Sequence, residues 1–142
     1  MSDTNELVID QIELQAAQYI PNHDGHCVFV HGHTYVINNL HIGVKRNAFL
    51  DFGKIKKMFS DHLDHVMFVP HRFYNDWMAL RPLLKPMGAD LKLVGVPGDN
   101  TVEEQSWLIV RMLRELDTEN IVMISFCITE GLHQGIQIRW KK

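Results

Sequence analysis

The sequence predicts a single α+β domain spanning residues 1–142, with a four-stranded antiparallel sheet and two helices on one of its faces. Segments near both ends of the chain alternate between apolar and polar residues, which is typical of strands, whereas two central segments repeat their apolar residues at helical spacing. No linker, low-complexity segment or repeat divides the chain, and 142 residues is a usual length for one domain. The expected order is strand, strand, helix, helix, strand, strand.

The strands are expected in two pairs. In the first pair, the alternation of the leading strand is imperfect, while Val36, Leu40, Ile42 and Val44 share one parity in the strand that follows. The two are joined by a loop rich in turn residues and histidine, PNHDGH. The predicted strands cover residues 7–20, 31–46, 122–130 and 136–140, and residues 91–96 could add a short one.

The two helices have different signals. The first, over residues 51–63, has an apolar stripe made of Phe52, Ile55, Phe59 and Leu63. The second begins after Thr101, because Thr101 and Glu104 have the spacing of a capping box. Between the helices, prolines favour only short pieces over residues 66–87.

Composition narrows the class of protein. The net charge is −3, which argues against nucleic acid or an anionic membrane as a general partner, because binding to either depends on clustered positive charge. No apolar run has the length of a membrane span, and the polar opening MSDTNE does not resemble a signal peptide. Two cysteines make no disulfide framework, so we expect a cytoplasmic setting.

Histidine is the unusual residue, with nine in the chain. His31 and His33 are separated by Gly32 in a predicted strand, so their side chains would point to one face with Cα atoms about 6.5 Å apart. Two imidazoles in this arrangement could bind one zinc ion, although they could also be ordinary surface histidines. Further histidines in the same region, at positions 23, 26 and 41, could supply a third ligand.

Cysteine and paired acidic residues add candidates for chemistry. Cys27 lies in the polar loop before His31, where a nearby cation would favour its thiolate, whereas Cys127 lies in an apolar strand and is expected in the core. Asp64 and His65 follow the first helix and could form an acid–base unit, although a histidine there also suits the helix dipole.

Glu130 continues the apolar parity of its strand. An inward carboxylate needs a partner, which a ligand with paired N–H groups would supply, unless this residue is a solvated strand end.

Together and in this order, these residues resemble the 6-pyruvoyl-tetrahydropterin synthase and 6-carboxy-tetrahydropterin synthase family, which has the tunnelling fold. The resemblance runs nearly end to end. A gap of three residues between cysteine and the HGH motif is similar to the 6-carboxy-tetrahydropterin branch. The motifs are Ala16-Ala17, Cys27-x3-His31-Gly32-His33, Asp51-Phe52, Leu63-Asp64-His65, Thr101-x-Glu103 and Thr129-Glu130.

The resemblance implies a lyase that converts 7,8-dihydroneopterin triphosphate into 6-carboxy-tetrahydropterin, acetaldehyde and triphosphate, on the route to 7-deazaguanine and queuosine. It implies Zn²⁺ held by His31, His33 and a third histidine after the Ala-Ala pair. It also implies a homo-oligomer, commonly a dimer of trimers, with active sites at subunit interfaces. The implied catalytic residues are Cys27, Asp64 and His65, the last two from a neighbouring subunit, and the implied substrate-binding residues are Glu130, Thr101 and Glu103.

One position departs from the family pattern, because Gln18 stands where the third zinc histidine is expected. Three outcomes are open: Gln18 binds zinc through its oxygen, His23 or His26 replaces it, or the site holds little metal. The alternatives to the lyase are a pterin-binding homologue with impaired catalysis, or 6-pyruvoyl-tetrahydropterin synthase or dihydroneopterin aldolase-like activity on the same scaffold. Asn100 stands where the family usually has proline, which we expect to matter little.

Overall fold

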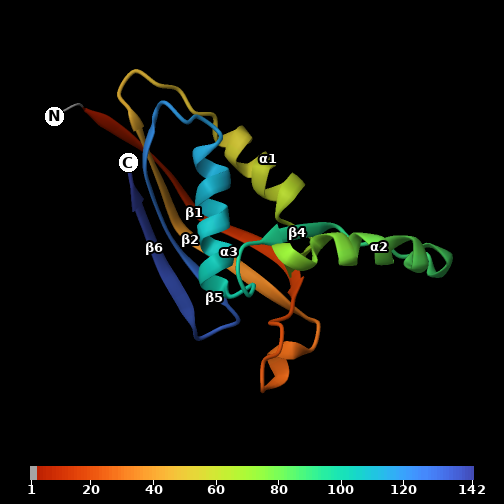
Figure 1. Cartoon of the computed structure of the whole chain (residues 1–142). Coiled ribbons are helices and arrows are strands. Elements are labelled where there is room, and N and C mark those ends of the chain that lie inside the picture. The colour runs from red at the N-terminus through yellow and green to blue at the C-terminus, as the bar shows by residue number, and fades with distance from the viewer. Residues whose placement is uncertain (1–2) are drawn as a thin grey trace.

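Six strands form one mixed sheet in the computed structural model of the protein, which describes residues 3–142 (Figure 1). Their order across the sheet is β4-β3-β1-β2-β5-β6. The strands are β1 (Thr4–Gln18), β2 (His31–Lys45), β3 (Val66–Pro70), β4 (Leu93–Val96), β5 (Ile121–Glu130) and β6 (Gly135–Lys141). The helices are α1 (Phe52–His62), α2 (Tyr74–Leu84) and α3 (Val102–Arg114), with short 3₁₀ turns η1 (His26–Val28), η2 (His71–Phe73) and η3 (Lys85–Met87). The expected α+β class is confirmed.

β1 and β2 form a long antiparallel hairpin whose register positions several candidate site residues. Residues that are directly paired across antiparallel strands lie on the same face of the sheet. Gln18 is paired with His31, so the two side chains share a face. β5 runs antiparallel on the other side of β2 and sets Glu130 opposite Tyr35. The end of β1, the start of β2 and the end of β5 therefore lie side by side.

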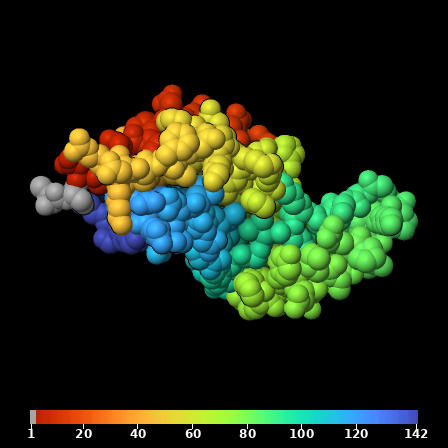
Figure 2. All heavy atoms as spheres, turned by 90° about the horizontal axis from the view of Figure 1, so that it is seen from above, coloured from red at the N-terminus to blue at the C-terminus, as the bar shows by residue number. Residues whose placement is uncertain are grey.

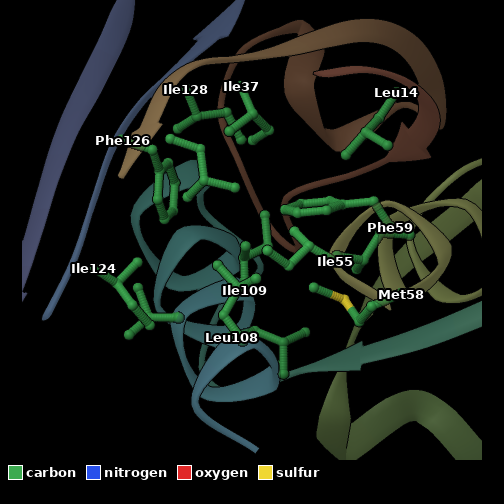
Figure 3. Packing of buried hydrophobic residues seen from close by; sticks show 14 of the residues in the cluster. Leu14, Ile37, Ile55, Met58, Phe59, Leu108, Ile109, Ile124, Phe126 and Ile128 are labelled. Atoms are coloured by element: carbon green, nitrogen blue, oxygen red, sulfur yellow. The ribbon is translucent and has the colours of Figure 1, made fainter. Parts of the chain in front are cut away.

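The main core lies between the sheet and the helices α1 and α3 (Figure 3). Ile55 and Phe59 of α1 and Ile109 of α3 pack in one cluster with Ile37 and Phe126 of the sheet. All five are almost completely buried. Since burial of such a side chain stabilises a fold by about 1.5–3 kcal/mol, this cluster holds both helices against the sheet.

The predicted four-stranded antiparallel sheet with two helices is wrong in detail. β3 and β4 extend the sheet beyond β1, and both run parallel to their neighbours. β3 pairs with β1 only at Ala16 and Ala17, so the addition is short. The third helix, α2, lies where prolines favoured short pieces. Pro82 lies in the last turn of α2, so the lost i→i−4 hydrogen bond disturbs only the end of the helix, which passes directly into the 3₁₀ turn η3.

Two residues are less buried than the sequence predicted. Phe52, at the start of the apolar stripe of α1, is 46% exposed. Cys127 is only half-buried, which corrects its assignment to the core. Its neighbours Phe126 and Ile128 take up the buried face of β5, and alternation turns Cys127 to the other face.

α2 projects away from the sheet and the other helices (Figures 1 and 2). None of its residues is buried, which agrees with this position. Across residues 3–142, no helix has both the length and the apolar character that a membrane crossing needs.

Candidate functional site

The ends of β1, β2 and β5, the turn η1 and the start of α3 surround a cavity of about 640 Å³. This volume lies within the range of small-molecule sites. The cavity gathers most of the residues for which the sequence predicted a chemical role. It is lined by Gln18, Ile20, His26, Cys27, Phe29, His31, His33, Thr101, Val102, Glu103, Glu130 and Gln134.

His31, His33 and Glu130 form a group that could hold a metal ion. One ligand atom from each lies within 4.8 Å of the others. His33 Nε2 is 2.6 Å from Glu130 Oε1, so the imidazole N–H donates to the carboxylate. Ligand atoms around tetrahedral zinc are about 3.3 Å apart, and two imidazoles with one carboxylate are a donor set that zinc accepts. The residues present therefore fit a zinc ion.

The His31 ring is oriented by the backbone next to it. Its Nδ1 lies 2.6 Å from the carbonyl oxygen of Phe29. A carbonyl can only accept a hydrogen bond, so Nδ1 carries the hydrogen and Nε2 of the neutral ring has a free lone pair. Metal-binding histidines commonly have such a backbone partner, which fixes the tautomer and the ring plane.

Gln18 is almost completely buried, and hydrogen bonds engage both ends of its amide. Nε2 donates to Glu130 Oε1 at 2.6 Å, and Oε1 accepts from Nε2 of Gln105. Because a carboxylate accepts and does not donate, the amide nitrogen of Gln18 must face Glu130. The expected metal ligand therefore lies directly behind Glu130, with its oxygen turned toward Gln105.

Asn100 has a larger structural role than we expected from the sequence. It is completely buried, and its Nδ2 donates to the carbonyl oxygens of Tyr19 and Phe68. Both its backbone oxygen and its side-chain oxygen accept from Gln105 Nε2. Its φ of 64° lies in the left-handed region, which asparagine tolerates better than most residues. Asn100 thus joins β1, β3 and α3 behind the cavity.

Gln105 and Tyr35 were missed by the sequence reasoning. Gln105 lies four residues before Ile109 on the buried face of α3, and a polar residue on such a face needs partners. That spacing was the available signal. Tyr35 Oη and Gln105 Oε1 are both buried without a hydrogen-bond partner among residues 3–142. Burial, then the charge of Glu130, raises the pKa of Tyr35.

Cys27 lies in η1 and is half-buried at the cavity wall. Its carbonyl oxygen accepts from the N–H of Ile20 at 2.7 Å, which ties the turn to the end of β1. Of the two histidines considered as replacements for Gln18, His26 lines the cavity. His23 Nδ1 instead accepts a hydrogen bond from the Gly25 N–H in its own loop.

Thr101 and Glu103 reach the cavity because α3 begins there. Thr101 caps the helix, and its capping box with Glu104 is confirmed. The turn before the cap needs Gly98, whose φ is 78° and where a Cβ would overlap the Glu104 carboxylate. This local geometry leaves Glu103 in the first turn of α3 on the cavity wall.

Asp64 and His65 do not line this cavity. His65 Nδ1 lies 3.1 Å from Asp64 Oδ2, and the His65 side chain is 77% exposed. Burial favours a raised pKa for Asp64, but the N–H groups of Gln15 and His65 and the charge of His65 outweigh it and lower this pKa. His65 borders a second hollow that also includes Gly32 and His33. The acid–base pair is formed, but it stands apart from Cys27.

A family model described as 6-pyruvoyl tetrahydropterin synthase matches residues 8–139. The chain belongs to this family. The family resemblance identified from the motifs is thereby confirmed, and the protein has a fold that the family uses for pterin processing. No curated protein sequence gives a significant match to the chain.

Solved structures have the same overall fold at low sequence identity. The 6-pyruvoyl tetrahydropterin synthase of Plasmodium falciparum is 16% identical, with full coverage of both chains and a TM-score of 0.65. That of Plasmodium vivax is 15% identical over 99% of both chains, with a TM-score of 0.64. An uncharacterised protein from Wolinella succinogenes is 13% identical, with coverage of 96% of this chain and 98% of the other and a TM-score of 0.62. The mixed sheet of this family member therefore belongs to an architecture that its relatives share.

Proposed function

We propose that the protein is a cytoplasmic, zinc-dependent 6-carboxy-tetrahydropterin synthase. It would convert 7,8-dihydroneopterin triphosphate into 6-carboxy-tetrahydropterin, acetaldehyde and triphosphate, a step toward 7-deazaguanines such as queuosine. One observation carries the proposal: Cys27, His31, His33 and Glu130 come from separate segments and line one cavity of ligand size. Membership of the 6-pyruvoyl tetrahydropterin synthase family supports a pterin substrate, and the three-residue gap between Cys27 and His31 supports the 6-carboxy product.

The residues of the cavity divide into two groups of roles. His31 and His33 would hold zinc, which when bound supplies a Lewis acid that polarises the hydroxylated side chain of the substrate. Thr101 and Glu103, at the start of α3, would hold the pterin ring. Glu130 is a further candidate for contact with the ring. Cys27 would accept or shuttle the proton of the substrate side chain, since it lines the same cavity as the histidines.

Asp64 and His65 would act from a neighbouring subunit. His65 is largely exposed and lies outside the cavity of its own chain, so its ring is available to a partner's cavity. An Asp that holds His in one tautomer is a competent proton-transfer pair. We therefore propose a homo-oligomer, with the dimer of trimers that the family resemblance implies and with each active site completed across an interface.

A second candidate is a pterin-binding protein with impaired catalysis. The observation that favours it is Gln18, whose amide is engaged by Glu130 and Gln105 instead of extending to the histidines. A third candidate keeps the same cavity but cleaves the pterin side chain differently, as in a 6-pyruvoyl-tetrahydropterin synthase or an aldolase.

Product analysis separates these candidates. The zinc-supplemented protein is incubated with 7,8-dihydroneopterin triphosphate, and acetaldehyde and the pterin product are followed together. We expect equal amounts of acetaldehyde and 6-carboxy-tetrahydropterin. A pyruvoyl product without acetaldehyde would favour the 6-pyruvoyl reaction, the triphosphate ester of glycolaldehyde would favour the aldolase, and tight pterin binding without turnover would favour the binding protein.

A further inference from the structure

We propose that Glu130 is the third protein ligand of the metal and that Gln18 is the residue that positions it. This inference rests on the metal-dependent function proposed above and concerns the same site. It gives the chain a centre of two histidines and a carboxylate, in which the glutamine that replaces the expected histidine contributes without touching the metal.

The amide of Gln18 is hydrogen-bonded at both of its ends. Its nitrogen donates to Glu130 and its oxygen accepts from Gln105, in a setting where only 3% of the residue is exposed. If the oxygen turned to bind a metal, the hydrogen bonds of Gln18 to Glu130 and to Gln105 would both be lost, although Gln105 Nε2 would keep its two acceptors on Asn100. The loss of two hydrogen bonds at so buried a residue is costly, so the observed orientation is preferred.

The position of Glu130 is set by its strand, β5. It is the last residue of β5 and continues the face of Ile124, Phe126 and Ile128, which points its carboxylate inward. Its oxygen already lies 2.6 Å from His33 Nε2, and one carboxylate oxygen lies within 4.8 Å of a ring nitrogen of His31. A cation among these three groups would take the place of the hydrogen that His33 now donates to the carboxylate.

Glu130 is supported by a chain of buried polar side chains. Gln105 donates to Gln18, and Asn100 fixes Gln105 through two oxygens. Asn100 also donates to the carbonyl oxygens of Tyr19, directly after β1, and of Phe68 in β3. Gln18, Gln105 and Asn100 are all at least nine-tenths buried. Such a built support holds a carboxylate in one place, which is what an outer-shell group does for a metal ligand.

The charge of the centre follows from this assignment. Zn²⁺ with two neutral histidines and one carboxylate has a net charge of +1, whereas three neutral histidines would leave it at +2. The lower charge weakens the attraction of the centre for an anionic oxygen of the substrate. Glu130 is then committed to the metal, and Glu103 is the other carboxylate on the cavity wall.

Zinc affinity tests the assignment without any substrate. The intact protein is stripped with a chelator, and zinc binding is measured by competition with a chromophoric chelator. We expect Glu130→Gln, which keeps an acceptor for Gln18, to weaken zinc binding by about 100-fold or more, and Gln18→Leu to weaken it by about 10–100-fold. Glu103→Gln is the matched control, a carboxylate of the same cavity outside the cluster, and should change the affinity by no more than about twofold.

Cobalt substitution separates a ligand from a positioning residue. The visible absorption of bound Co²⁺ reports the atoms that touch the metal, so Gln18→Leu should keep the spectrum of the wild type at saturating metal, while Glu130→Gln should change it. The assignment is overturned if Glu130→Gln keeps wild-type zinc affinity, if Gln18→Leu changes the spectrum as His31→Ala does, or if the wild type binds no zinc. Circular dichroism of each variant identifies any that fails to fold, in which case the conservative Glu130→Asp, with a shorter reach, should show the same loss.

The outcomes for this inference and for the proposed function are distinct. Zinc binding that depends on Glu130, without turnover of the pterin substrate, would support the metal assignment and contradict the enzyme. Turnover with a zinc affinity that is indifferent to Glu130 would support the enzyme and contradict the assignment.

Discussion

Two histidine–carboxylate pairs in this chain are built in opposite ways. His33 and Glu130 come from different strands and are backed by the buried amide of Gln18. Asp64 and His65 are sequence neighbours, and the His65 side chain is 77% exposed. The first pair is fixed by long-range packing before any ligand arrives, so it suits a metal centre. The second is tied to β1 through Gln15, but its histidine side chain is exposed and is available to groups outside its own chain.

The largest expected effect concerns Cys27, which lines the same cavity as His33 and Glu130. Replacement of Cys27 by Ala should lower turnover by about 100- to 10,000-fold, the usual contribution of a positioned proton-transfer group. Pterin binding should be retained, because Thr101 and Glu103 are untouched. Turnover and equilibrium binding of the pterin are measured on the same preparation, and undiminished turnover would exclude the assigned role of Cys27.

A mixing experiment tests whether the second pair acts on a neighbouring subunit. Cys27→Ala and His65→Ala subunits, each of low activity, are unfolded together and refolded as mixed oligomers. Because a site that joins two subunits can receive both intact residues, about a quarter of wild-type turnover should return at a one-to-one ratio. If no activity returned although mixed oligomers had formed, Cys27 and His65 would not act across an interface.

Removal of the support behind the first pair should destabilise the fold. Asn100→Ala deprives the carbonyl oxygens of Tyr19 and Phe68 of a buried donor, at a cost of about 2–4 kcal/mol in the free energy of unfolding. Urea unfolding measures this change. Asn5→Ala is the matched control, since its exposed amide makes a single hydrogen bond to Arg46, and should cost less than about 0.5 kcal/mol. Equal effects of the two substitutions would contradict the role of Asn100.

The smallest expected effect concerns the second pair and depends on pH. The pKa of Asp64 is lowered in the folded protein, so its ionised carboxylate stabilises the fold above the ordinary value of 3.8 and loses this contribution as the pH falls through the folded pKa. Asp64→Asn should therefore be less stable than the wild type near neutral pH, and the difference should shrink as the pH falls below 3.8 and through the lowered pKa. A stability difference that stayed constant as the pH fell from neutral through this range would show that ionisation of Asp64 does not contribute.

Much of the fold could be predicted because its long elements carry strong local signals. The capping box of Thr101 and the alternation of β5 are visible in the sequence and were confirmed. The short strand suggested over residues 91–96 is confirmed as β4, but β3 was not predicted, because it touches β1 at only two positions and its pairing is parallel and non-local. α2 was missed because proline is a strong breaker signal, whereas the real helix has Pro82 near its end.

The candidate site was predictable in its residues but not in their arrangement. His31 and His33 are identified by spacing alone, and Glu130 by its parity on β5. The sequence could not show that Gln18 meets Glu130, because the two lie 112 residues apart and their contact depends on the register of three strands. Asn100 likewise has no local signal for burial, since its partners come from β1, β3 and α3.

The most direct test of the central claim is a zinc titration of turnover. Protein stripped of metal is supplied with increasing zinc, and acetaldehyde release from 7,8-dihydroneopterin triphosphate is measured at each zinc-to-chain ratio. A metal-dependent pterin lyase at the His31 and His33 cavity predicts that turnover rises in proportion to bound zinc and levels off at about one zinc per chain. Full turnover in the stripped protein, or no acetaldehyde at any zinc content, would contradict the account.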